Sequence, residues 1–214
     1  MLKLIVLSGL SAALLKIKTV APTYVLSLCV SVSSSRTQDP SRPLFVVQIP
    51  NVSMAASNWL PGHDTPPAPS HVAQSLQHAF EAQGHHHGAL FLAHSYGSTY
   101  ANFALQLCPE IVRGCVLVEP ASMLCHLPKM TKSFMYTLGA EGWKSPLSVM
   151  FRLEPHVAVS LRRHFGMQNL MFLTDLKGVC PGAVLVSKGD TIMASDAILE
   201  HARQVRLTAL CLLF

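Results

Sequence analysis

Gly88-Ala-Leu-Phe-Leu-Ala-His-Ser-Tyr-Gly-Ser98 is the stretch that decides the fold. Residues 90–92 form a short apolar run behind a glycine, which is typical of a buried parallel strand. Ser95 follows, and the residues two before and two after it, Ala93 and Gly97, are small. Small residues at these positions let a strand and the next helix approach closely. The stretch therefore predicts a strand, a sharp turn with serine at its tip, and a helix.

The usual form of such a turn is G-x-S-x-G, whereas this chain has A-x-S-x-G. Alanine keeps the small volume but loses some of the backbone freedom of glycine, so the departure is mild. Apolar residues after the turn recur at helical spacing, up to a proline that ends the segment. An ordinary strand-to-helix turn with a capping serine is the alternative. The residues at helical spacing and the proline are Tyr100, Phe103, Ala104, Leu107 and Pro109.

The composition is unusually apolar for a chain of 214 residues, which is long enough for one domain with a sizeable core. Half of the residues are hydrophobic and 13% are charged, against about 25% charged residues in an average soluble domain. We therefore expect a membrane or a partner to cover part of the surface, or part of a larger fold to be missing. The net charge of +5 is scattered without interleaved aromatic residues, so we expect no nucleic-acid partner.

The six cysteines have mostly apolar neighbours and include no C-x-x-C pair. A disulfide framework is not expected in a chain with this much core, and zinc-ligand spacing is absent. The sequence predicts buried thiols at Cys29, Cys108, Cys115, Cys125, Cys180 and Cys211.

Histidines gather before the central stretch, in the triplet 85–87 with His71 and His78 upstream. Such a group suits a metal ion, but no carboxylate or cysteine completes a ligand set. A polar loop is the favoured interpretation, and we expect neither a metal nor another cofactor.

Two apolar runs, residues 4–15 and 20–32, lie on either side of Lys16 and Lys18. The first run has the length of a signal-peptide core, and neither run alone reaches the roughly 20 residues of a membrane span, so a signal anchor would have to join both runs and bury the two lysines. Alternatively, residues 4–10 form a core strand that ends in a turn at Ser8-Gly9. A membrane-associated location through this segment and a cytoplasmic one both stay open.

Further strands and helices alternate along the rest of the chain. A polar linker at 33–42 precedes the strand Leu44-Phe-Val-Val-Gln-Ile49, which Pro50 stops and which we expect to pair near the central strand. Proline-rich residues 61–69 form a loop, and Ser70 begins a helix through Phe80. A buried strand follows at 114–118, with a helix at 195–205 and a last strand at 207–214.

The second informative stretch is Ala183-Val-Leu-Val-Ser-Lys-Gly-Asp190, an apolar strand followed by a loop that presents a carboxylate. Ser95 and Asp190 would both lie where a parallel strand meets its loop, the edge at which open α/β sheets place their sites. Glu119 also follows a strand and is the less favoured acid. An aspartate in an ordinary tight turn is the alternative for Asp190.

Together these features resemble the α/β-hydrolase superfamily, in its single-domain branch with a cap. The resemblance covers about residues 44–214, behind a hydrophobic N-terminal segment and linker at 1–43. It implies an α/β fold, a mostly parallel sheet flanked by helices, with a helical cap insertion at about 121–178. The motifs that carry it are the Pro50-terminated strand, Ala93-His-Ser-Tyr-Gly97, Val118-Glu-Pro120 and Ser187-Lys-Gly-Asp190.

The resemblance also implies hydrolysis of a carboxylic ester, with a small-molecule ester or lipid-like substrate. Ser95 would be the nucleophile and Asp190 the acid that orients a histidine. Backbone N–H groups of Tyr96 and, from the N-terminal segment, Leu10 would form the oxyanion hole. Large apolar residues in the cap favour a substrate with an apolar acyl group.

The chain departs from the family at the catalytic histidine, which should follow the last strand. No histidine follows residue 207, and none of the others is assigned as the base. We therefore expect either a truncated version of an active enzyme or a catalytically inactive binding or membrane-associated module. The histidines not assigned are His94, His126, His156, His164 and His201.

Overall fold

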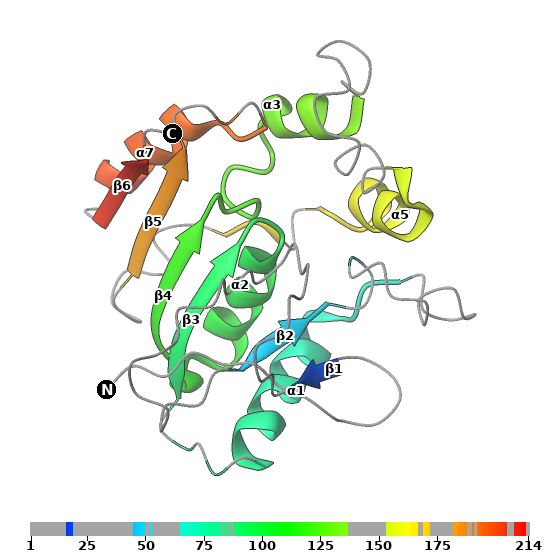
Figure 1. The fold of residues 1–214 in the computed structure, drawn as a ribbon, viewed down its shortest axis with the longest axis vertical. Coiled ribbons are helices and arrows are strands. Elements are labelled where there is room, and N and C mark those ends of the chain that lie inside the picture. Colours follow the sequence, from blue (N-terminus) through cyan, green and yellow to red (C-terminus); the bar gives the residue numbers. More distant parts are fainter. Residues whose placement is uncertain are drawn as a thin grey trace.

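A sheet of four parallel strands forms the centre of the fold (Figure 1). The structure is a computed structural model that describes residues 16–18, 45–49, 52, 65–82, 84, 86, 88–136, 153–166, 169–171, 182–187, 190, 192–204 and 208–212. The strand order follows the chain, from β3 (Ala89–His94) through β4 (Val112–Val118) and β5 (Gly182–Ser187) to β6 (Thr208–Leu212). The predicted α/β class with a parallel sheet is therefore confirmed.

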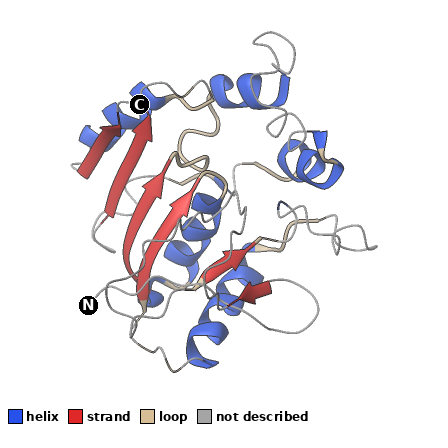
Figure 2. Cartoon of the chain, in the orientation of Figure 1, coloured by secondary structure: helices blue, strands red, loops and turns tan. Residues whose placement is uncertain are grey.

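Helices return the chain between successive strands, as parallel pairing requires. Helix α2 (Gly97–Leu107) follows β3 and packs against β3 and β4, and α7 (Ser195–Gln204) packs against β5 and β6. Helix α1 (Pro69–Ala82) packs on α2, and Figure 2 shows how helices and sheet form separate layers. The helices predicted at 70–80 and 195–205 and the last strand are confirmed within one or two residues at their starts and ends.

The strand before the proline-rich loop pairs differently from the prediction. β2 (Val46–Gln48) forms an antiparallel pair with β1 (Lys16–Lys18), in a sheet separate from β3. Phe45, next to β2, is buried, and its ring lies 5.8 Å from that of Phe80 on α1. The apolar residues around β2 therefore find burial against α1, without the expected pairing beside the central strand.

The N-terminal alternatives lie mostly outside the described residues. Residues 4–10 and 20–32 belong to the part not described, whereas Lys16–Lys18, where the sequence predicted no element, is an extended segment opposite Val46–Gln48. Among the residues that the structure describes, no helix is long and apolar enough to span a membrane.

The described residues between β4 and β5 include short helices as well as turns. This segment contains the short helix α3 (Pro128–Thr131), the π-helical turn η4 (Lys132–Tyr136) and α5 (Pro155–Arg163). Its two ends meet, because Met123 and Met171 form a parallel β-bridge and Met171 N donates to Ser122 O at 3.0 Å. Residues 122–123 and residue 171 of this segment, which we call the long excursion (residues 119–181), therefore lie side by side.

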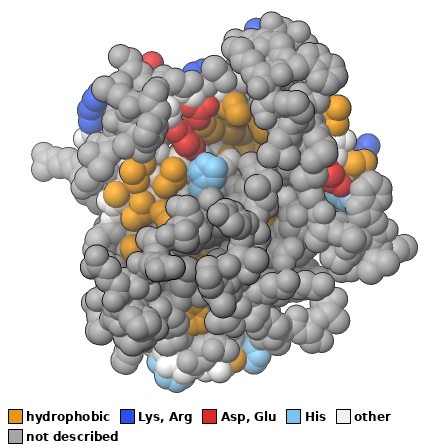
Figure 3. All heavy atoms as spheres, in the orientation of Figure 1, with side chains coloured by type: hydrophobic (Ala, Val, Ile, Leu, Met, Phe, Trp, Pro, Cys, Tyr) orange, Lys and Arg blue, Asp and Glu red, His pale blue; other side chains and the backbone are white. Residues whose placement is uncertain are grey.

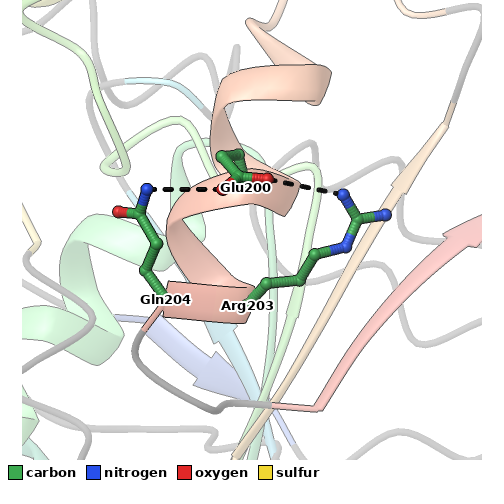
Figure 4. Close-up of polar contacts among 3 residues, drawn as sticks. All are labelled: Glu200, Arg203 and Gln204. Carbon is green, nitrogen blue, oxygen red and sulfur yellow. Dashed lines mark hydrogen bonds and ion pairs between the residues drawn. The ribbon is translucent and has the colours of Figure 1, made fainter.

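On the exposed face of α7, Glu200 forms an ion pair and a hydrogen bond with neighbouring side chains (Figure 4). Arg203 Nη1 lies 3.6 Å from Glu200 Oε2, and Gln204 Nε2 donates to Glu200 Oε1 at 3.4 Å. The Arg203 and Glu200 side chains are 70% and 61% exposed. Such surface pairs at helical spacing contribute at most a few tenths of a kcal/mol, roughly.

We expect Glu154→Ala to destabilise the protein by about 1 kcal/mol, because Glu154 caps α5. Its Oε2 accepts a hydrogen bond from Val157 N at 2.6 Å, and the residue is 8% exposed. Thermal unfolding followed by circular dichroism should show a melting temperature lower by roughly 2–4 °C. Glu200→Ala is the matched control and should change it little. Equal melting temperatures for the two variants would contradict this role of Glu154.

Candidate active site

Ser95 occupies a strained turn directly after β3 and before α2. Its backbone φ is 50°, in the left-handed region that non-glycine residues rarely adopt. Such a conformation costs about 1–3 kcal/mol and persists only where the surroundings enforce it. The predicted strand, turn and helix are all present.

The strained backbone of Ser95 is held by the segment that follows β4. Ser95 N donates to Val118 O at 2.9 Å, and Ser95 O accepts from Ser98 Oγ, Ser98 N and Ala121 N at 2.7, 3.1 and 3.2 Å. Ser98 Oγ in turn accepts from Ser122 N at 2.9 Å. Both ends of the turn are thus fixed to residues 118–122, and the side chain of Ser95 takes no part in these bonds.

The small residues around the turn are buried, as the sequence analysis requires. Ala93 lies opposite Leu117 in the sheet and is 3% exposed, and Gly97 is a buried first residue of α2. Tyr96 stands at the N-terminus of α2, where backbone N–H groups and the helix dipole stabilise negative charge. Leu10, the predicted second donor, lies outside the described residues.

Asp190 is fixed by the loop after β5. Its Oδ1 accepts hydrogen bonds from Ile192 N at 2.7 Å and Met193 N at 3.2 Å, and its own N–H donates to Ser187 O at 3.4 Å. Because β3, β4 and β5 are parallel neighbours, Ser95 and Asp190 lie at the same edge of the sheet, with β4 between them.

Glu119 lies between these two residues, at the end of β4, and joins β4 to β5. Its φ is 45°, its N–H donates to Leu185 O at 2.9 Å, and its Oε1 accepts from Ser187 N at 2.5 Å. Burial and then a hydrogen bond to the neighbouring Asp190 carboxyl raise the pKa of Glu119 to about 7, against the lowering effect of the Ser187 N–H. Figure 3 shows acidic side chains beside a histidine and hydrophobic side chains on this face.

From the sequence, Glu119 was only the less favoured acid, and its contact with Asp190 was not predicted. The signal was present, because both residues follow neighbouring parallel strands. What the sequence does not contain is the left-handed backbone of Glu119, which accompanies its link to β5.

One aromatic side chain from the segment between β4 and β5, that of Phe165, packs beside the turn. The Tyr96 ring lies 6.1 Å from the Tyr100 ring and 5.5 Å from the ring of Phe165, which follows α5. Phe134 and Leu124 also pack on the core and are partly buried. An apolar wall therefore adjoins the residue after Ser95.

The described histidines are spread over several elements. His94 ends β3, His126 is exposed after β4, His156 and His164 lie in and just after α5, and His201 lies in α7. Within the described ranges no three metal-binding side chains come together. His85 and His87 of the histidine triplet lie outside those ranges.

The described thiols are free, in line with the sequence prediction. Cys108 and Cys115 are buried and Cys125 is partly buried. Burial, with a smaller effect of the Glu110 charge, raises the pKa of Cys108 to about 12, and burial also raises that of Cys125. The side chains of Cys29, Cys180 and Cys211 lie outside the described part of the chain.

The sequence matches no protein-family model and no curated protein sequence. The structure is similar to those of known α/β hydrolases and carboxylesterases, at low identity. One is a carboxylesterase of the ammonia-oxidizing thaumarchaeon Nitrososphaera gargenis, at 13% identity, with 69% of this chain and 64% of that chain covered and a TM-score of 0.44.

A second similar structure is an α/β hydrolase from the metagenome of lagoon sediments at Mar Chica, Morocco, at 16% identity. It covers 78% of this chain and 65% of that chain, with a TM-score of 0.45. A third is a carboxylesterase from Bacillus subtilis, also at 16% identity, with 69% and 61% covered and a TM-score of 0.42. The chain spans less than two thirds of each of these structures.

Proposed function

We propose that this chain is a serine hydrolase-like protein that acts on carboxylic esters with an apolar acyl group. The observation that carries the proposal is the left-handed φ of Ser95, at the junction of a buried parallel strand and a helix N-terminus. This backbone strain is maintained by hydrogen bonds to residues 118–122, and strain of this kind is typical of functional sites.

In the proposed reaction, Ser95 Oγ attacks the ester carbonyl carbon while its proton passes to a base. The carbonyl oxygen becomes an oxyanion, which accepts hydrogen bonds from the N–H of Tyr96 and of Leu10. The C–O bond then breaks, the alcohol leaves with a proton, and water releases the acid from Ser95. Asp190 orients the base, which we assign to none of the described histidines. Without an effective base, about 10³–10⁴-fold acceleration over water is left to binding and the oxyanion hole.

The preference for an apolar acyl group follows from the wall beside the turn. Phe165 contacts Tyr96, and Phe134 and Leu124 lie partly buried in the same excursion between β4 and β5. We propose that residues 121–178 form a cap on a domain of residues 44–214. The bridge between Met123 and Met171 would then form the base of this cap.

Covalent labelling with an alkyl fluorophosphonate tests this function, because such probes react with activated serines independently of the natural substrate. We expect saturable labelling of the folded protein that an ester with an apolar acyl chain blocks better than one with a charged acyl chain. Ser70 is an exposed serine in α1, and the Ser70→Ala variant should be labelled to the same extent as the wild type. No labelling of protein shown to be folded would contradict the proposal and favour a non-catalytic binding role.

A further inference from the structure

Glu119 is the side chain through which the ends of β4 and β5 are joined beside the candidate site. Its backbone N–H reaches β5 at Leu185 O, and its Oε1 receives Ser187 N. Two residues with positive φ, Ser95 and Glu119, each follow the last residue of their strands. Glu119 is flanked on both sides by residues bonded to the Ser95 backbone: Val118 O accepts from Ser95 N, and Ala121 N donates to Ser95 O.

The carboxyl oxygens of Glu119 and Asp190 are used unequally. Oε1 of Glu119 accepts a hydrogen bond from Ser187 N. Oδ1 of Asp190 accepts hydrogen bonds from Ile192 N and Met193 N. Oε2 of Glu119 is buried and receives no donor N–H or O–H within the described chain, yet the Asp190 carboxyl lies within hydrogen-bond reach of Glu119. A buried carboxylate oxygen without a donor is costly, and two adjacent carboxylates repel each other. One proton between them removes both penalties.

We propose that Glu119 is a positioning residue that, in its protonated form, donates a hydrogen bond from Oε2 to Asp190 and so holds the carboxylate of Asp190 for its role beside Ser95. This assignment rests on the proposed function for the role of Asp190, but the pairing of the two carboxyls does not. The pair then carries one negative charge, on Asp190, where a histidine base would need it.

Among the described residues, the titratable groups at this edge come from three strand ends: His94 at the end of β3, Glu119 after β4 and Asp190 after β5. Burial first, and then the hydrogen bond to Asp190 and the Asp190 charge, raise the pKa of Glu119 to about 7, which places its ionisation near neutrality. Below this pH the hydrogen bond is present. Above it, Glu119 is ionised and no longer donates the hydrogen bond. The side chain of Asp190 should then move away from Glu119. The folded state binds this proton in a range where the unfolded chain has lost it, so stability falls as pH rises from about 4.5 through 7.

The test is a titration of the full chain followed by NMR, which reports on the pair without requiring any reaction at Ser95. Protein with ¹³C-labelled glutamate carboxyls should show one carboxyl that titrates near pH 7 and is missing in Glu119→Gln. In Asp190→Asn its midpoint should fall part of the way toward the ordinary range, because the negative charge is removed and an amide NH2 donor replaces one of the two acceptor oxygens, while the burial of Glu119 is unchanged. The backbone amides of Ile192 and Met193, which donate to Asp190, should shift with the same midpoint in the wild type.

Glu119→Gln and Glu119→Ala separate positioning from a merely structural role. Glutamine keeps the acceptor for Ser187 N–H and donates permanently to Asp190, so the Ile192 and Met193 amides should keep their low-pH positions at every pH. Alanine removes both bonds, so these amides should lie at displaced positions at every pH.

The outcomes distinguish the inference from the proposed function. A Glu119 carboxyl that titrates at about 4–5, or one whose midpoint Asp190→Asn leaves unmoved, overturns the pairing. Equal amide positions in Glu119→Gln and Glu119→Ala overturn the positioning role. If the carboxyl titrates near 7 and depends on Asp190, but fluorophosphonate labels no serine, the pairing stands and the proposed hydrolase function falls.

Discussion

Replacing Ser95 with alanine should abolish labelling by an alkyl fluorophosphonate, leaving only the background of heat-denatured protein. The change removes the hydroxyl that forms the covalent bond. It keeps the backbone bonds to Val118, Ser98 and Ala121 that hold the turn, so the fold should be retained. Adduct mass by intact-protein mass spectrometry and melting temperature by circular dichroism would measure both effects. Ser70→Ala is the matched serine control, and undiminished labelling of Ser95→Ala would contradict the assignment.

Ser95→Cys provides a second readout that does not depend on a base. A thiol next to the N-terminus of α2 should have a lowered pKa, so at neutral pH it should react with iodoacetamide roughly tenfold faster than an ordinary thiol or more. Cys108 and Cys115 are buried and should stay unmodified in the folded protein, and the raised pKa of Cys125 makes it slow. Peptide mapping of the alkylated protein would identify the modified thiols.

Gly88→Ala should be the most destabilising change at the start of the central strand. Gly88 has a φ of +66°, and an added Cβ would lie 2.5 Å from Ile111 O and 2.7 Å from Ile111 C. Strain at positive φ and a backbone clash each cost about 1–3 kcal/mol. We expect a loss of about 2–5 kcal/mol, a large part of the roughly 5–15 kcal/mol that stabilises a typical domain.

Gly84→Ala is the matched control for Gly88→Ala. Gly84 has nearly the same φ, +68°, but an added Cβ would have no heavy atom within 4 Å. Its loss should be about 1 kcal/mol, from backbone strain alone. Urea unfolding of both variants would give the two free energies of unfolding. Equal losses would show that β3 and the turn before β4 do not approach as closely as described.

The sequence was sufficient to predict the elements that their own residues determine. The apolar run 90–92, the small residues around Ser95 and the helical spacing after it predicted β3, the turn and α2, and all three are present. Gly182–Ser187 and Ser195–Gln204 were equally visible, because a buried strand and an amphipathic helix each carry their own pattern.

Features that depend on contacts distant in sequence could not be predicted in the same way. The pairing of Val46–Gln48 with Lys16–Lys18 depends on where Phe45 finds burial, which the local pattern does not show. The contact between Glu119 and Asp190 joins residues far apart in the chain through one left-handed backbone angle. In both cases the local sequence pattern lacks the same information, namely which tertiary neighbour overrides or completes a local preference.

The central claim is that Ser95 is an activated nucleophile presented by a strained turn. The most direct measurement is identification of the modified residue in wild-type protein treated with the alkyl fluorophosphonate, by proteolysis and tandem mass spectrometry. The account predicts a phosphonyl adduct on Ser95 within residues 88–98. An adduct at other serines with Ser95 unmodified, in protein whose melting transition confirms that it is folded, would contradict it.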